Sequence, residues 1–196
     1  MYNSSANPQI AYSLTALSEA LFELMNEKDI EEITITQLCA RAQIARKTFY
    51  RNCVNKMDLV DYMMEKHVRD LLSGVDYTSE EYRTLYRNFF CFWKSRSSFL
   101  RVIYRQGLFS RFCTVLTRCC YQESDYRFLR AFLEKKKNPD SLRQFHHAFL
   151  VGALCQMLEQ WTREDFATTI DELVSVLSHL VPAYCGKNPA PNDGHD

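Results

Sequence analysis

The sequence has few residues that break helices and no long apolar run. Only five glycines and five prolines occur among 196 residues, whereas an all-β chain needs turn residues about every 8–12 positions. No stretch approaches the roughly 18–20 apolar residues of a membrane helix. The opening residues MYNSSANPQIAYS lack the basic and apolar blocks of a secretion signal. We therefore expect an all-α, cytoplasmic protein with no membrane partner.

Motifs of catalysis and metal binding are also missing. There is no HExxH, no pair of zinc ligands, no phosphate-binding glycine loop and no nucleophile elbow. We expect no enzyme, no metal and no cofactor. The eight cysteines include no CxxC pair, which favours reduced, buried thiols. A redox role of Cys119 and Cys120 stays open, because exposed thiols beside Arg118 would have lowered pKa values.

Apolar residues recur at three- and four-residue steps along most of the chain, which predicts helices. The expected helices span about 8–28, 35–42, 46–52, 57–71, 79–94, 97–106, 108–119, 124–136, 139–160 and 164–180. We expect Thr34 and Gln37 to form a capping box, Asn55 to cap the fourth helix, and Thr162 to open the last one. Gly74 follows the fourth helix, and Thr78 starts a new capping box. We therefore expect one domain over 1–73, a second over 74–183, and a frayed tail over 184–196.

Positive charge in the first domain is confined to a short region. Residues 36–57 contain no carboxylate and five basic side chains: Arg41, Arg46, Lys47, Arg51 and Lys56. They lie on a short helix, a tight turn and a second short helix, an arrangement that places one helix in the DNA major groove. A merely solvated surface is the alternative explanation.

The run TITQLCARAQIARKTFYRNCVNKMDLVDYM, which begins at Thr34, closely resembles the DNA-binding region of the TetR (tetracycline repressor-like) transcription regulators. The residues in register with the family pattern are Thr34, Leu38, Ala42, Ile44, Thr48, Phe49, Tyr50 and Lys56. The match covers roughly residues 10–65, and it implies an N-terminal three-helix, helix-turn-helix domain followed by a helical domain for effector binding and dimerisation.

Three positions depart from the family pattern. Gln43 replaces the glycine of the turn, and a non-glycine residue at positive φ costs about 1 kcal/mol. Ala45 replaces the usual Ser or Thr cap of the second short helix, a loss of about 0.5–2 kcal/mol. Cys53 stands where a phenylalanine anchors the motif. We therefore expect the second short helix to be held mainly by packing.

The resemblance implies a role for each polar residue of the motif. Arg46, Lys47 and Thr48 would face base edges in the major groove. Contacts to phosphates would come from Thr34, Thr36, Tyr50, Arg51 and Lys56. Tyr50 has an alternative or additional role as a core ring packed on the first helix. Lys56 also lies at the start of its helix, where the positive end of the helix dipole and the free N–H groups favour an anion.

Aromatic residues gather between positions 82 and 132, where 14 rings occur. Family members resembling this chain bind small effectors in the corresponding domain. The candidate pocket consists of Tyr86, Phe89, Phe90, Trp93, Tyr104, Phe109, Phe112 and Phe128. An ordinary aromatic core is the alternative.

The last two expected helices are apolar over a wide arc. The resemblance implies that they dimerise as a four-helix bundle. The candidate dimer residues are Phe145, Phe149, Gly152, Leu173, Leu177 and Leu180. Gly152 in a helix costs about 1 kcal/mol relative to alanine, and close approach of another helix would explain it. Burial within one chain is the alternative.

Together these features predict a homodimeric, ligand-responsive DNA-binding regulator, most simply a repressor that binds a palindromic operator in double-stranded DNA. Its effector would be a small molecule of unknown identity. The alternative is a small-molecule-binding or thiol redox-sensing helical protein whose degenerate helix-turn-helix no longer binds DNA specifically.

Overall fold

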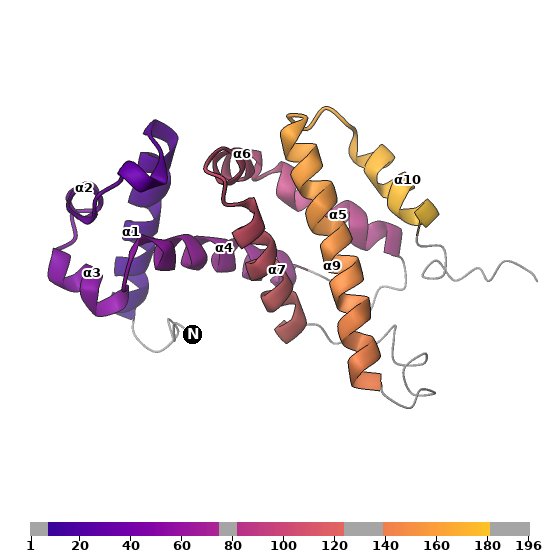
Figure 1. The fold of residues 1–196 in the computed structure, drawn as a ribbon, viewed down its shortest axis with the longest axis horizontal. Coiled ribbons are helices and arrows are strands. Elements are labelled where there is room, and N and C mark those ends of the chain that lie inside the picture. The colour runs from indigo at the N-terminus through magenta and orange to yellow at the C-terminus, as the bar shows by residue number, and fades with distance from the viewer. Residues whose placement is uncertain (1–7, 75–81, 124–138, 181–196) are drawn as a thin grey trace, which may run out of the picture. The chain divides into compact units, whose positions relative to one another are not determined.

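The computed structural model describes residues 8–74, 82–123 and 139–180, and every regular element in these ranges is helical (Figure 1). The elements are α1 (Pro8–Glu27), the 3-10 helix η2 (Ile30–Glu32), α2 (Ile35–Arg41), α3 (Arg46–Asn52), α4 (Lys56–Ser73), α5 (Tyr82–Lys94), α6 (Ser97–Arg105), α7 (Phe109–Glu123), α9 (Pro139–Arg163) and α10 (Ile170–Leu180). The predicted all-α fold is confirmed for this part of the chain. The expected helix over 124–136 lies outside the described residues.

The chain divides into two compact units. Unit 1 lies within residues 1–70 and 98–122 and holds α1, α2, α3, almost all of α4, and α6 and α7. Unit 2 lies within residues 71–97 and 123–196 and holds α5, α9 and α10. Thus α6 and α7, which the sequence placed in the second domain, pack with the N-terminal helices. The functional division near Gly74 stays a prediction.

In unit 1, α1 packs against α2 and α3. Its buried leucines Leu14, Leu17, Leu21 and Leu24 recur at three- and four-residue steps, so they form one apolar face. Phe49 of α3 is 0% exposed and belongs to the same core. Burial of these side chains therefore joins the three N-terminal helices.

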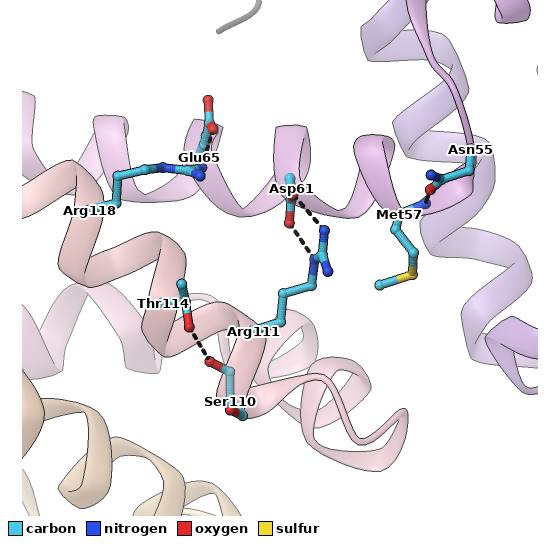
Figure 2. A network of polar contacts seen from close by, with 8 residues as sticks. All are labelled: Asn55, Met57, Asp61, Glu65, Ser110, Arg111, Thr114 and Arg118. Carbon is cyan, nitrogen blue, oxygen red and sulfur yellow. Dashed lines mark hydrogen bonds and ion pairs between the residues drawn. The ribbon is translucent and has the colours of Figure 1, made fainter.

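Ion pairs join α7 to α4 within unit 1 (Figure 2). The guanidinium of Arg111 donates to both carboxylate oxygens of Asp61, with Nε–Oδ1 at 2.5 Å and Nη2–Oδ2 at 2.7 Å. Further along the same two helices, Arg118 donates to Glu65. A two-bond guanidinium–carboxylate contact fixes orientation as well as adding attraction. The two ion pairs, Arg111–Asp61 and Arg118–Glu65, therefore align α7 along α4.

Three helices end in the same way. After α2, the N–H of Ile44 donates to the carbonyl of Cys39 at 3.0 Å, and the N–H of Gln43 bonds three residues back at 3.2 Å. These two bonds define a Schellman motif, in which the residue after the cap takes a positive φ. That residue is Gln43 (φ 55°) after α2, Gly107 (φ 66°) after α6 and Asp165 (φ 51°) after α9. Glycine fills only one of these three left-handed positions.

In unit 2, α10 packs against α5 and begins at Ile170, six residues later than expected. The sequence suggested Thr162 as the cap, but this side chain is buried in α9 and its hydroxyl donates to the carbonyl of Leu158 at 2.8 Å. The cap is instead Thr169, whose N–H and hydroxyl both donate to Glu172, at 2.8 and 2.7 Å. The expected start of the last helix was therefore wrong because α9 continues through Arg163.

Candidate nucleic-acid interface

The first short helix of the motif, α2, begins with a complete capping box. The hydroxyl of Thr34 accepts from the N–H of Gln37 at 3.2 Å, and the Gln37 side chain accepts from the N–H of Thr34 at 3.1 Å. Lys28 donates to the same Gln37 oxygen at 2.9 Å. The predicted cap is confirmed, and α2 is held at its start by side chains on both sides of the boundary.

The turn from α2 to α3 has the backbone that the sequence predicts. Gln43 takes φ 55°, the left-handed conformation expected where the family pattern has glycine. Ala45 caps α3 without any side-chain hydrogen bond, also as predicted. What holds α3 is Phe49, which is 0% exposed, together with Cys53 just after the helix, which is 4% exposed.

The thiols beside this turn are buried and protonated. Burial, with a smaller contribution from the neighbouring carboxylate of Asp58, raises the pKa of Cys53 to about 12. Burial likewise raises the pKa of Cys39 on α2. Cys53 therefore acts as a small apolar group at the position where the family pattern has phenylalanine.

The cations of residues 36–57 fall into two groups. Arg41 at the end of α2 binds the α1 carboxylates of Glu23 (3.2 Å) and Glu27 (2.9 Å), and its hydrogen bond lowers the pKa of Glu27. Among the described residues, no carboxylate pairs with Arg46, Lys47 or Arg51, and all three side chains are exposed. Of the two short helices, α3 therefore carries the positive charge that no carboxylate compensates.

The remaining predicted residues of α3 also lie on its accessible surface. Thr48 is partly exposed, and Tyr50 is 54% exposed. The Tyr50 ring packs edge-on against Phe49, with centroids 5.2 Å apart. Tyr50 is therefore accessible to a phosphate, and its packing on the first helix stays a prediction.

The two candidate threonines of α2 differ in their availability. The hydroxyl of Thr34 is already engaged with Gln37, both as acceptor and as donor. Thr36 is exposed, and it makes no side-chain hydrogen bond within the described residues. A phosphate contact from α2 therefore falls more naturally to Thr36 than to Thr34.

Lys56 has partners within the chain. Its ammonium group donates to the backbone carbonyls of Ile30, Glu31 and Ile33, the last two at 3.1 Å. An ammonium has three N–H donors, so these carbonyls use all of them. The expected phosphate contact of Lys56 stays a prediction, and it would require one of these bonds to be exchanged for a phosphate.

The N-terminal end of α4 is also occupied. The side-chain oxygen of Asn55 accepts from the N–H of Met57 at 2.8 Å (Figure 2). The carboxylate of Asp58 accepts from the N–H of Val54 at 2.6 Å and from that of Asn55 at 3.2 Å. The cap expected from Asn55 to Asp58 is confirmed, and the Asp58 carboxylate lies in the first turn of α4, where the helix dipole favours negative charge.

The candidate effector residues lie in two separate aromatic clusters, one in each unit. In unit 2, Tyr86, Phe89, Phe90 and Trp93 are all buried on α5, and Phe90 meets Trp161 of α9 edge-on at 5.5 Å. In unit 1, the rings in ordered contact are Tyr104, Phe109, Phe112 and Phe99. Phe128 lies outside the described residues. The pocket stays a prediction, and each described cluster is packed as a core.

The adjacent thiols of α7, Cys119 and Cys120, are buried and partly buried respectively. Cys119 is 4% exposed, and burial raises its pKa despite the presence of Arg118. Burial also raises the pKa of Cys120 to about 12. The expectation of exposed thiols with lowered pKa values is therefore wrong for this pair, because their burial outweighs the nearby guanidinium.

The candidate dimer residues divide into exposed and buried groups. Phe145 and Phe149 on α9 are 72% and 60% exposed, and a Cβ added at Gly152 would meet no described atom within 4 Å. Leu173 and Leu177 on α10 are 8% and 2% exposed, so their own unit already buries them. These two leucines need correction as dimer contacts, because α10 packs its apolar face against α5. On α10, Leu180 and the previously unconsidered Val176 remain exposed.

Sequence reasoning missed one further residue of this region, Gln106, which lies between α6 and α7. Its side chain bonds to Met25, Lys28 and Ile30, all of them about 80 positions away in the sequence. Only the glycine that follows it, at the end of an apolar period, marked the turn. Nothing in the local sequence indicates the partners of the glutamine.

Among the described residues, no helix is both long and apolar enough to cross a bilayer. No protein-family model matches the sequence, and no curated protein matches it. Among solved structures, the chain is similar to the dihydroxyacetone kinase operon activator DhaS, with 15% identity and a TM-score of 0.52, over 88% of this chain and 96% of that one. At this identity the likeness shows a shared helical fold.

Proposed function

We propose that this protein is a DNA-binding transcription regulator that acts as a homodimer and reads its operator with α3. The observation that carries the proposal is the separation of charge in the motif. Arg41 is neutralised by two glutamates, whereas Arg46, Lys47 and Arg51 are exposed and unpaired among the described residues. A helix that follows a tight turn and carries unpaired cations can enter the major groove of DNA and bind the neighbouring phosphates.

Base contacts would come from Arg46, Lys47 and Thr48, which start α3. A guanidinium or ammonium suits the O6 and N7 atoms of guanine, and the threonine methyl suits thymine. Tyr50, Arg51 and Thr36 would hold phosphates and fix the register without reading sequence. Lys56 would serve chiefly by ordering the segment before α2, and Thr34 by capping α2.

The exposed apolar residues of α9 and α10 would supply the dimer contact. Phe145, Phe149 and Gly152 are spaced four and three residues apart, so they share one helix face. Two copies of this face can meet by an isologous contact and place two α3 helices about 34–36 Å apart on a palindromic site. An unidentified small effector would shift the protein between conformations that differ in DNA affinity, and repression is the simplest outcome.

The DNA experiment compares Lys47→Ala with Arg51→Ala in fluorescence-anisotropy titrations against the DNA that flanks the protein's own gene. Lys47→Ala should weaken binding and relax preference at one base position, worth about 1–3 kcal/mol of discrimination. Arg51→Ala should weaken binding to every DNA sequence alike, and it should reduce the salt dependence of the affinity by the amount expected for about one phosphate contact. Lys66→Ala, which removes an exposed cation from α4, is the control and should bind as the wild type does.

Two results would contradict this assignment. The first is a wild-type protein without a salt-sensitive, sequence-preferring complex. The second is a Lys47→Ala variant that loses equal affinity for all sites, because a base-reading side chain must change preference.

The dimer is tested by sedimentation velocity on Phe149→Glu. A buried carboxylate at a self-complementary contact should convert the dimer to a monomer, because each partner would face an unpaired charge. Tyr12→Glu, which alters an aromatic ring that is 71% exposed on α1, is the matched control and should remain dimeric. A monomeric wild type would refute the contact.

A further inference from the structure

The turn between α6 and α7 has a defined geometry, and one of its side chains, Gln106, contacts the segment that joins α1 to η2. The N–H of Leu108 donates to the carbonyl of Ile103 at 2.9 Å, and that of Gly107 donates to the carbonyl of Tyr104 at 3.0 Å. Gly107 takes φ 66°, where a glycine is unstrained. Gln106 is therefore the cap residue of a rigid Schellman motif.

The side chain of Gln106 makes three hydrogen bonds to the backbone at the junction of α1 and η2. Its amide nitrogen donates to the carbonyls of Met25 at 2.8 Å and Lys28 at 3.0 Å. Its amide oxygen accepts from the N–H of Ile30 at 2.8 Å. Arg105 adds a bond from its guanidinium to the carbonyl of Met25 at 2.9 Å. We call the three bonds of Gln106 the Gln106 clasp.

The segment gripped by the Gln106 clasp leads directly into α2. The 3-10 helix η2 begins at Ile30, and Thr34, the cap of α2, follows two residues after its end. Lys56 holds the carbonyls of Ile30, Glu31 and Ile33 from another direction. Backbone groups of η2 that lack helical partners are thus satisfied by two side chains distant in sequence.

We infer that Gln106 is a positioning residue for the reading pair α2 and α3. Its clasp fixes where η2 begins, and the short η2 then fixes where the capping box of α2 can form. Because α2 and α3 are joined by a tight turn, the placement of α2 sets that of α3. The inference rests on the proposed function for what α3 reads, but the mechanical role of Gln106 stands on its contacts.

The Gln106 clasp also connects the α6–α7 hairpin to the segment that leads into the reading pair. The hairpin is attached to α4 by the Arg111–Asp61 contact, and it is attached separately to the α1–η2 junction by Gln106. A change in the α6–α7 turn would therefore reach the α1–η2 junction through three hydrogen bonds, and through η2 it would reach the start of α2. This makes the turn a site at which DNA affinity can be tuned without altering any residue of the motif.

The test uses Gln106→Met in the full-length protein, because methionine keeps the length of the side chain and removes all three bonds. In amide hydrogen exchange, the N–H of Ile30 and those of α2 should exchange roughly tenfold faster or more, while α1 residues before Met25 and unit 2 stay as in the wild type. The control is Gln160→Met, because Gln160 bonds only to exposed groups near the end of α9.

DNA affinity separates positioning from general destabilisation. The comparison variant is Val115→Ala, which removes a side chain that is 2% exposed in the same unit. The resulting cavity should destabilise the fold without touching the Gln106 clasp. At equal folded fraction, Gln106→Met should bind the wild-type site about 3- to 30-fold more weakly, whereas Val115→Ala should bind it as the wild type does.

Each outcome decides the inference. A uniform rise of exchange throughout unit 1, or unchanged exchange in α2, would overturn it. So would equal DNA affinity of Gln106→Met and Val115→Ala. If the wild type bound no DNA, the proposed function would fail, and the exchange pattern would still decide whether Gln106 positions α2.

Discussion

The two short helices of the motif have equal length and are held in different ways. Both α2 and α3 have seven residues. The first has a reciprocal capping box, and its terminal arginine is neutralised by two glutamates of α1. The second has no side-chain cap and keeps its cations unpaired among the described residues, so that buried Phe49 carries its attachment. Local signals define α2, whereas tertiary burial defines α3 and leaves its polar surface available.

The largest expected effect comes from removing the anchor of α3. Phe49→Ala should lower the free energy of unfolding of unit 1 by about 3–5 kcal/mol, because the ring is fully buried and its loss leaves a cavity. Urea denaturation followed by far-UV circular dichroism measures this change. Phe49→Leu, which keeps most of the volume, is the control and should cost less than about 1.5 kcal/mol. A cost below about 1 kcal/mol for the alanine variant would mean that burial does not hold α3.

An intermediate effect is expected at the cap of α2. Thr34→Ala removes the hydroxyl that accepts from the N–H of Gln37, and it should cost about 0.5–2 kcal/mol in the same denaturation experiment. Thr34→Ser keeps the oxygen and should behave nearly as the wild type. If the two variants proved equally stable, the capping box would contribute nothing, and the contrast with α3 would disappear.

The smallest expected effect is a gain in stability at the turn between the two helices. Gln43→Gly should stabilise unit 1 by about 1 kcal/mol, because glycine adopts the observed φ of 55° without strain. Its midpoint of thermal unfolding should rise. Gln37→Gly provides the opposite control, because it places glycine inside α2 and breaks the capping box. A destabilised Gln43→Gly variant would show that the side chain of Gln43 contributes more than its backbone strain costs.

The sequence predicted those parts of the site that depend on near neighbours. The capping box at Thr34 and the cap at Asn55 follow from residues within four positions of each other. The left-handed Gln43 and the uncapped Ala45 were predicted from the resemblance to the family pattern. The late start of α10 was missed because two threonine caps competed, and the burial of Thr162 decided between them.

Features that depend on distant segments could not be predicted in this way. The neutralisation of Arg41, the carbonyl partners of Lys56 and the Gln106 clasp each require a partner at least 14 positions away. The burial of Leu173 and Leu177 required knowing which side of α10 meets α5. Apolar periodicity identifies a face, but it does not distinguish an intrachain neighbour from a second copy of the chain.

The distribution of indole rings gives the protein a built-in spectroscopic reporter. The chain has two tryptophans, Trp93 and Trp161, and both are almost completely buried in unit 2. Unit 1, which holds α3, has none. Tryptophan fluorescence is therefore insensitive to events confined to unit 1. Any shift in that emission when an oligonucleotide is added would measure communication from one unit to the other, without a label.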